Sequence, residues 1–124
     1  MVKIDKVIAG ASEYVKDKLY PSLDSVNRMK ISAALSLARL RPDGALKLML
    51  IHFLPNTTVE KALESAAVMG IIDGKGNVDV ELLLDIAKAH IQEFGELGVN
   101  LFGIEFDLSE ANIEMLGDYI KKAG

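Results

Sequence analysis

The sequence contains no cysteine. This absence excludes a disulfide framework, a thiolate nucleophile, a zinc ribbon and an iron–sulfur site, and it is what a reducing compartment allows. Basic residues are also in the minority, because 14 Lys and Arg face 18 Asp and Glu, giving a net charge of −4. A chain with this balance is not expected to be a general nucleic-acid binder.

A long apolar run is lacking as well. The most apolar stretch is residues 31–54, in which two arms, 31–38 and 45–54, flank a charged turn segment at 39–44. Neither arm reaches the roughly 18 apolar residues that a membrane span requires. We therefore expect a buried helical hairpin, with a membrane-inserting hairpin of the holin type as the alternative. The first residues hold no apolar region long enough for a secretory signal, which favours a cytoplasmic location.

Half of the residues are apolar, and a chain of 124 residues can bury roughly two-thirds of the surface it exposes when unfolded. We expect one mainly α domain over residues 1–124, a single compact bundle of about six helices with a small β element, a hairpin, in the second half. Apolar spacing and capping residues predict helices at 3–19, 25–40, 43–53, 58–69, 80–94 and 109–122. A strand is predicted at 99–107, and two short extended pieces around a turn at 71–78.

The predicted helix at 25–40 carries apolar residues around most of its circumference. They are Val26, Met29, Ile31, Ala33, Ala34, Leu35, Leu37 and Ala38. A helix that is apolar on all sides is typically buried, so we expect this one to be central in the bundle. Its many alanine and serine residues would let a neighbouring helix approach closely.

The segment 73–79 resembles part of an EF-hand calcium loop, because oxygen-bearing side chains alternate along it. The comparison fails at three positions. Lys75 stands at the third position, Val78 replaces the required glycine, and Leu84 replaces the bidentate glutamate. We interpret the segment as a tight turn followed by Asp79 as a helix N-cap.

The two histidines, His52 and His90, lie among apolar residues in predicted helices. Zinc needs at least three protein ligands, and the missing ones would have to be carboxylates brought together by the fold. We therefore expect core or boundary histidines. No catalytic, cofactor-binding or metal-ligating residue is predicted, and no cofactor is expected.

A ridge of carboxylates is predicted on the last helix. Glu110, Glu114 and Asp118 follow one another at four-residue intervals, which puts them on one helix face. We interpret this acidic ridge as a solvated face. Two alternatives are a divalent cation site and a docking surface for a basic protein.

Charge is divided unevenly along the chain. Residues 1–60 hold nine basic and six acidic residues, net +3, whereas residues 61–124 hold five and twelve, net −7. The basic residues of interest in the first half are Arg28, Lys30, Arg39 and Arg41. The two charged halves are expected to neutralise each other within one fold. Alternatively, they meet between copies in a head-to-tail assembly, or the segment 28–47 is a phosphate-contacting patch of a DNA-binding regulator.

Two segments of the second half carry a family resemblance. They read GIIDGKGNVDV and VNLFGIEFDLSEANIEMLGDYIKKA, and the N-terminal KIDKVIAGASEYV is compatible with them. Over about residues 69–123 the chain resembles small uncharacterised proteins from prophage regions of Gram-positive bacteria. That resemblance implies a phage-derived structural, assembly or interaction role, and it brings no assigned catalytic residues.

The sequence therefore predicts a small non-enzymatic helical protein that works by protein–protein interaction. Its expected partner is itself, in a homo-oligomer, or another phage or host protein. Candidate interaction residues are Arg28, Lys30, Arg39, Arg41, Glu110, Glu114 and Asp118. The alternatives are the membrane-active protein and the DNA-binding regulator described above.

Overall fold

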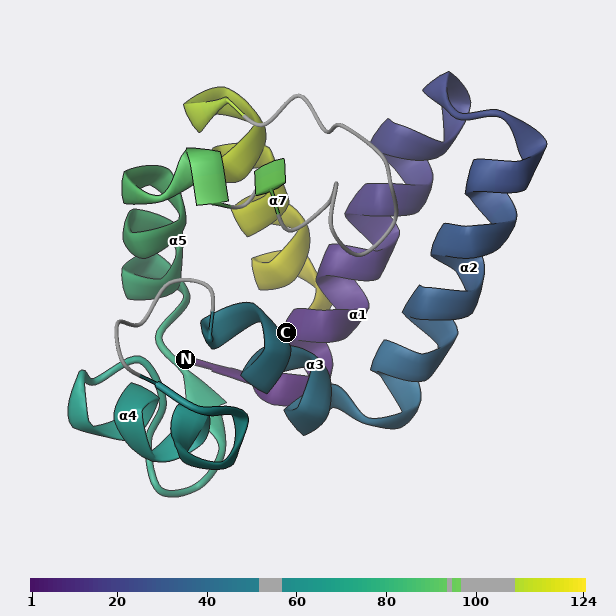
Figure 1. The fold of residues 1–124 in the computed structure, drawn as a ribbon. Helices are drawn as coiled ribbons and strands as arrows, with labels where there is room; N and C mark the ends of the chain where they lie inside the picture. Colours follow the sequence, from purple (N-terminus) through teal and green to yellow (C-terminus); the bar gives the residue numbers. More distant parts are fainter. Residues whose placement is uncertain (52–56, 94, 97–108) are drawn as a thin grey trace.

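A computed structural model describes residues 1–51, 57–93, 95–96 and 109–124 (Figure 1). The fold is mainly helical with a small antiparallel sheet, which confirms the predicted class. The predicted strand at 99–107 and His52 lie outside the described residues. The longer helices are α1 (Ile4–Tyr14), α2 (Ser25–Leu40), α3 (Pro42–Leu50), α4 (Ala62–Val68), α5 (Val80–Ala89) and α7 (Glu110–Ala123). The shorter elements are a π-helical turn (Val15–Leu19), two 3-10 turns (Tyr20–Ser22 and Val59–Lys61) and the strands β1 (Val2–Lys3) and β2 (Asn77–Val78).

Helices α1 and α7 lie side by side in the middle of the molecule (Figure 1). The contact is so close at Gly10 that a Cβ atom there would lie 2.5 Å from the Ile120 Cα atom. About one turn further along α1, the Tyr14 and Tyr119 rings meet edge to face, with centroids 5.7 Å apart. Tyr119 also donates a hydrogen bond to Asp17, with 2.9 Å between the oxygens. The two helices are therefore held together by backbone contact and by tyrosine contacts.

The small sheet joins the start of the chain to the predicted turn. β1 pairs antiparallel with β2, with Val2 opposite Val78, and an isolated bridge links Ile72 to Val78. The bridge confirms the extended pieces predicted at 71–78. The pairing with β1 was not predicted, because nothing in the local sequence indicates which distant segment a two-residue strand will meet.

Asp73 organises the turn between these extended pieces. One carboxylate oxygen accepts hydrogen bonds from the backbone N–H groups of Lys75 and Asn77, at 2.8 and 2.9 Å. The other oxygen accepts from the Asn77 side-chain amide at 3.0 Å. Hydrogen bonds from Asn77 hold the pKa of the Asp73 carboxyl below its usual value. Asp73, the first residue of the segment compared with a calcium loop, thus stabilises the turn through its own hydrogen bonds.

The core is assembled from one face each of α1, α3, α4, α5 and α7, together with the sheet. Its largest fully buried apolar side chains are Leu46, Leu50, Ile71, Ile113, Val7 and Val78. Asp79 is the predicted N-cap of α5, and it accepts a hydrogen bond from the backbone N–H three residues on. The sequence leaves two candidates at each of two other helix starts, Asp24 or Ser25 and Asp107 or Ser109, and the structure has Asp24 and Ser109 in this role.

The expectation that helix 25–40 is central is wrong. α2 lies at the edge of the molecule (Figure 1). Ile31 is the one residue of α2 that is fully buried. The prediction of a buried hairpin over 31–54 is therefore wrong for its first arm. The physical reason is that α1 meets α2 along one stripe only, because the opposite side of α1 is taken by α7.

Two local details also differ from the predictions. Pro42, expected within a turn, is the first residue of α3, a position where proline is tolerated because its missing N–H would have no helical partner. Ala111 is exposed, whereas the apolar spacing of the last helix predicts that Ala111 faces inward with Ile113, Leu116 and Ile120.

Substitution of Gly10 by Ala tests the close approach of α1 and α7. We expect the free energy of unfolding to fall by about 1 to 3 kcal/mol, since the added methyl group overlaps the backbone of α7. The control is Gly44→Ala in α3, where the nearest atom to an added Cβ, in Arg41, is 3.8 Å away. The control should gain up to about 1 kcal/mol from helix propensity. Denaturant unfolding measures the free energy of unfolding of both variants. If the two substitutions stabilised the protein equally, α1 and α7 could not be in close contact at Gly10.

The turn at Asp73 gives a pH prediction. A carboxyl whose pKa is lowered on folding adds stability above its ordinary pKa of 3.8, and this stability is lost as the pH falls through the folded value. Asp73→Ala should therefore lower the melting temperature at pH 7 and have less effect at pH 2. Thermal melts followed by circular dichroism measure the difference in melting temperature between the variant and the unmodified protein, with Asp85→Ala on α5 as control. A difference of the same size at pH 7 and pH 2 would contradict the role of the ionised Asp73 carboxylate in the turn.

Candidate interaction surface

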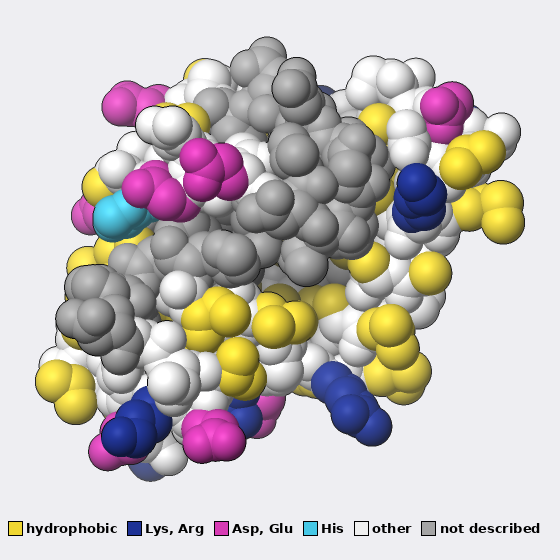
Figure 2. All heavy atoms as spheres, in the orientation of Figure 1, with side chains coloured by type: hydrophobic (Ala, Val, Ile, Leu, Met, Phe, Trp, Pro, Cys, Tyr) yellow, Lys and Arg dark blue, Asp and Glu magenta, His cyan; other side chains and the backbone are white. Residues whose placement is uncertain are grey.

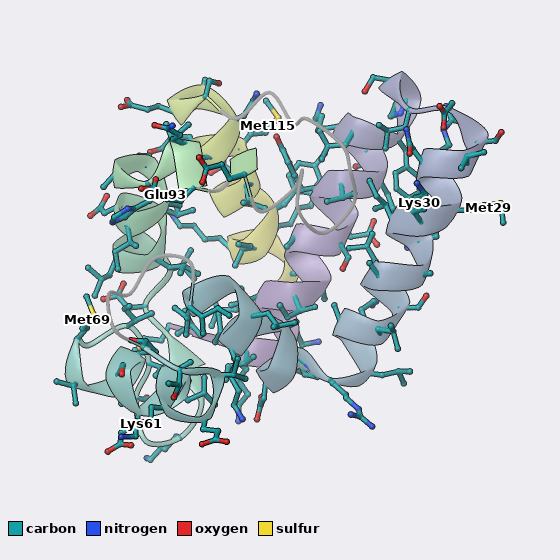
Figure 3. The ribbon with its side chains drawn as sticks, in the orientation of Figure 1. Met29, Lys30, Lys61, Met69, Glu93 and Met115 are labelled. Carbon is teal, nitrogen blue, oxygen red and sulfur yellow. The ribbon has the colours of Figure 1, made fainter. Side chains whose placement is uncertain are left out.

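The surface of α2 that points away from the bundle is apolar. Val26, Met29, Leu37 and Leu40 are 61, 73, 65 and 78% exposed, and Ala33 is exposed between them. With 3.6 residues per turn, these five side chains form one stripe about 80° wide along the helix. We call this stripe the outer face of α2. Figure 2 shows apolar side chains along this edge of the molecule, and Figure 3 shows Met29 pointing away from the remaining helices.

The opposite stripe of α2 fixes the helix to the bundle. Ile31 is 2% exposed, and Asn27, Ala34, Leu35 and Ala38 on the same stripe are half-buried. Helix α2 thus has two apolar stripes, of which one is packed and one is open. A solvent-exposed stripe of this extent marks an interaction site more often than it occurs by chance on a monomer.

Polar contacts at the N-terminal end of α2 set its orientation. Asp24 caps the helix by accepting from the Asn27 N–H at 2.8 Å. The Arg28 Nε atom donates to the Tyr20 carbonyl oxygen at 2.8 Å, and the Tyr20 and Ser32 hydroxyl oxygens are 2.6 Å apart. These contacts tie the helix to the 3-10 turn before it, so the outer face is held in a defined direction.

The four predicted basic residues are all exposed, and the structure does not gather them into one patch. Arg28 and Arg39 share a side of α2, but eleven residues at 1.5 Å each separate them by about 16 Å. Lys30 lies on the other side of the helix, next to the outer face, and Arg41 follows the helix end. Arg28 is also engaged with Tyr20. The basic residues therefore do not form a surface of their own, and of the four Lys30 is the one that borders the outer face of α2.

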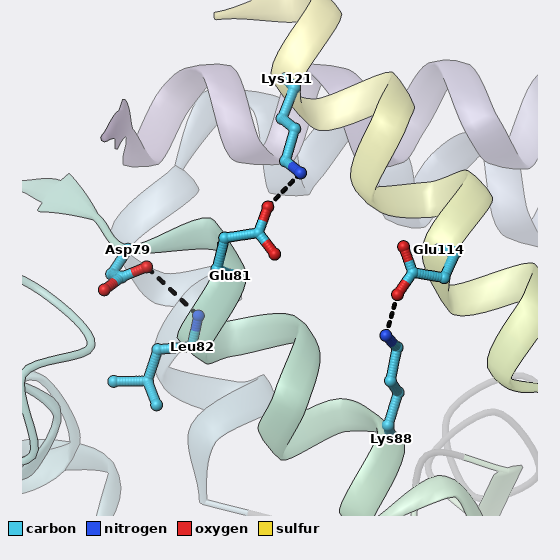
Figure 4. A network of polar contacts seen from close by, with 6 residues as sticks. All are labelled: Asp79, Glu81, Leu82, Lys88, Glu114 and Lys121. Atoms are coloured by element: carbon cyan, nitrogen blue, oxygen red, sulfur yellow. Dashed lines mark hydrogen bonds and ion pairs between the residues drawn. The ribbon is translucent and has the colours of Figure 1, made fainter.

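The predicted acidic ridge is present on α7, where Glu110, Glu114 and Asp118 are exposed. Two lysines form ion pairs on this side of α7 (Figure 4). Lys88 of α5 forms an ion pair with Glu114, and Lys121 of α7 forms one with Glu81 of α5.

The ion pair between Lys121 and Glu81 shifts the pKa of the lysine. The hydrogen bond to Glu81 raises the pKa of Lys121, and the nearby charge of Asp118 adds to this. Both ion pairs join two helices of the acidic half. They hold α5 against α7. Because Glu114 is paired with Lys88, the acidic ridge carries less unpaired negative charge than the sequence implies.

The remaining candidate groups are few. His90 is half-buried, with its Nδ1 atom 3.6 Å from a Glu93 carboxylate oxygen. Among the residues that the structure describes, no three His, Cys, Asp or Glu side chains are placed to hold a metal ion.

The apolar residues of the outer face were not among the predicted site residues. The sequence did hold a signal for them, because α2 contains no acidic residue and its apolar positions cover two separate sides of the helix. Periodicity alone assigned both sides to the core, since it does not indicate how many neighbours a helix has.

Comparisons with known proteins complete the description. A comparison with known protein families found no match, and comparisons with curated proteins and with solved structures found none either.

The engagement of Arg28 can be tested against its neighbour on the same side of α2. Arg28→Ala should lower the free energy of unfolding by about 1 kcal/mol, because the Tyr20 carbonyl loses its donor. Arg39→Ala should change it by less than about 0.5 kcal/mol, as is usual for an exposed surface residue. Urea unfolding of both variants measures the difference, and equal losses would show that Arg28 has no structural role.

Proposed function

We propose that this chain is a non-enzymatic cytoplasmic protein that works by protein–protein interaction, with the outer face of α2 as its binding surface. The observation that carries the proposal is the row of four large apolar side chains, each more than 60% exposed, on one side of a single helix. Covering such a row with another protein removes apolar area from water, which is the main driving force of most associations. The prophage-type assembly role implied by the sequence resemblance is compatible with this proposal.

The two alternative functions have less support. Among the described residues, no helix has both the length and the hydropathy needed to cross a membrane. Within the described part of this segment, residues 31–40 belong to α2 and Pro42–Leu50 form the short α3, and Arg39 lies near the end of α2. For the DNA-binding regulator, the four basic residues would have to form one phosphate-contacting surface, and their separation along and around α2 disfavours this.

A photo-crosslinking amino acid at Leu37 tests the proposed function directly. In cells of the source organism, illumination should give a discrete protein adduct, to a second copy or to another protein. The same group at Asp85, an exposed residue on α5, is the control and should give at least tenfold less adduct. Equal, diffuse labelling from both positions would refute α2 as the binding surface.

A further inference from the structure

We infer that the occupant of the outer face of α2 is the same face of a second copy, packed antiparallel across a two-fold axis at Ala33. This inference rests on the proposed function, because it names the partner for the surface described above. Three properties of α2 carry it: the symmetry of its apolar positions, the size of the central residue, and the places of its charges.

The apolar positions are symmetric about Ala33. Val26 and Leu40 lie seven residues before and after it, and Met29 and Leu37 lie four residues before and after it. A two-fold axis through Ala33 therefore brings Val26 level with Leu40 of the other copy, and Met29 level with Leu37. Two-fold dimers require such a self-complementary patch. The arrangement gives five layers of apolar contact with no apolar position left unmatched.

The residue at the centre is small. Ala33, with Ser36 bordering the outer face next to it, allows the helix backbones to come close together, within the usual interaxial range of about 8 to 10 Å. The longer side chains of Met29 and Leu37 then fill the space above and below the axis. A small residue at the axis with larger residues on both sides is the pattern that interlocking helices need.

Charge selects the antiparallel direction. In this register Lys30 is level with Ser36 of the second copy, Arg39 with Asn27, and Arg41 lies next to the level of Asp24. A parallel pair would place each basic residue level with itself, and α2 carries no acidic residue to compensate. The antiparallel pair thus places Lys30 opposite a neutral residue and Arg41 beside the Asp24 cap of the other copy. Arg28 comes within one residue of the level of Arg39 of the other copy, on the side of α2 turned away from the contact.

The size of the contact sets its strength. A helix of 16 residues is about 24 Å long, so one helix pair covers less than a standard interface unless neighbouring loops join in. We therefore expect a dimer that forms and dissociates with concentration. Because apolar contact drives the dimer, and the repulsion between Arg28 and Arg39 offsets the attraction between Arg41 and Asp24, added salt should leave the dimer unchanged or strengthen it. An assembly through the two charged halves would loosen in salt instead.

Disulfide trapping in the cysteine-free chain tests the register. Under mild oxidation, Ala33→Cys should form a covalent dimer, because Cα atoms at the axis lie about 5 Å apart in a close helix pair. Val26→Cys alone should give at least tenfold less, since its two copies would be about 21 Å apart. A mixture of Val26→Cys and Leu40→Cys should give the mixed dimer. Self-crosslinking of Val26→Cys equal to that of Ala33→Cys would overturn the antiparallel register.

Light scattering behind a sizing column, over a concentration series at low and high salt, tests the dimer itself. The unmodified protein should move from monomer to dimer, and Met29→Glu with Leu37→Glu should remain a monomer. The control is Val68→Glu on α4, which also changes a highly exposed apolar residue and should dimerise normally. Circular dichroism confirms that each variant is folded. A dimer that survives the double substitution, or that loosens in salt, would overturn the inference.

The outcomes also separate this inference from the proposed function. A monomer at every concentration, combined with a Leu37 photo-adduct to a different protein, would overturn the self-pairing and leave the proposed function standing. A monomer that gives no specific Leu37 adduct would overturn both. Sedimentation with anionic vesicles, abolished by the double substitution in a protein that stays monomeric, would overturn both in favour of a membrane surface.

Discussion

The contact between α1 and α7 at Gly10 is the constraint on which the rest of the fold depends. The two helices come so close there that no side chain fits between Gly10 and the backbone at Ile120. A second glycine in α7 plays the same part toward α5, because a Cβ atom at Gly117 would overlap the Leu84 side chain. Helix α7 is thus packed closely on two sides, and the ion pairs from Lys88 and Lys121 lie along its contact with α5.

This arrangement explains why α2 is left at the edge. One side of α1 is taken by α7, and the small sheet and α3 lie against its N-terminal part. Helix α2 can reach α1 along one stripe, which it does through Ile31 and its half-buried neighbours. Its second apolar stripe has no counterpart in the described part of the chain. The proposed binding surface thus belongs to a helix that carries more apolar residues than its neighbours in the fold cover.

The charged groups show a different relation between sequence and function. Basic and acidic residues are sorted between the two halves of the sequence, yet the lysine–carboxylate pairs at Lys88 and Lys121 form within the acidic half. The basic residues on α2 stay exposed around an apolar stripe. In the proposed dimer, charge would influence the direction of an apolar contact and would not by itself form it.

Much of the fold could be predicted from the sequence, because its signals are local. The caps at Asp24, Asp79 and Ser109 bond to N–H groups three residues away, and the turn at Asp73 is made by residues 73–77. Such short-range contacts depend on a few neighbouring positions in the sequence. The spacing of apolar residues at a period of 3.6 also indicates which helices are amphipathic.

The tertiary structure decided which apolar surfaces are covered. The pairing of β1 with β2 and the contact of Gly10 with Ile120 join residues far apart in the sequence, and no local pattern specifies them. For α2 the sequence determined a helix with apolar residues on two sides and the symmetry of its outer face about Ala33. The burial of the Ile31 side and the exposure of the other depend on where α1 and α7 lie, because an apolar side chain is buried only where a neighbour is present to cover it.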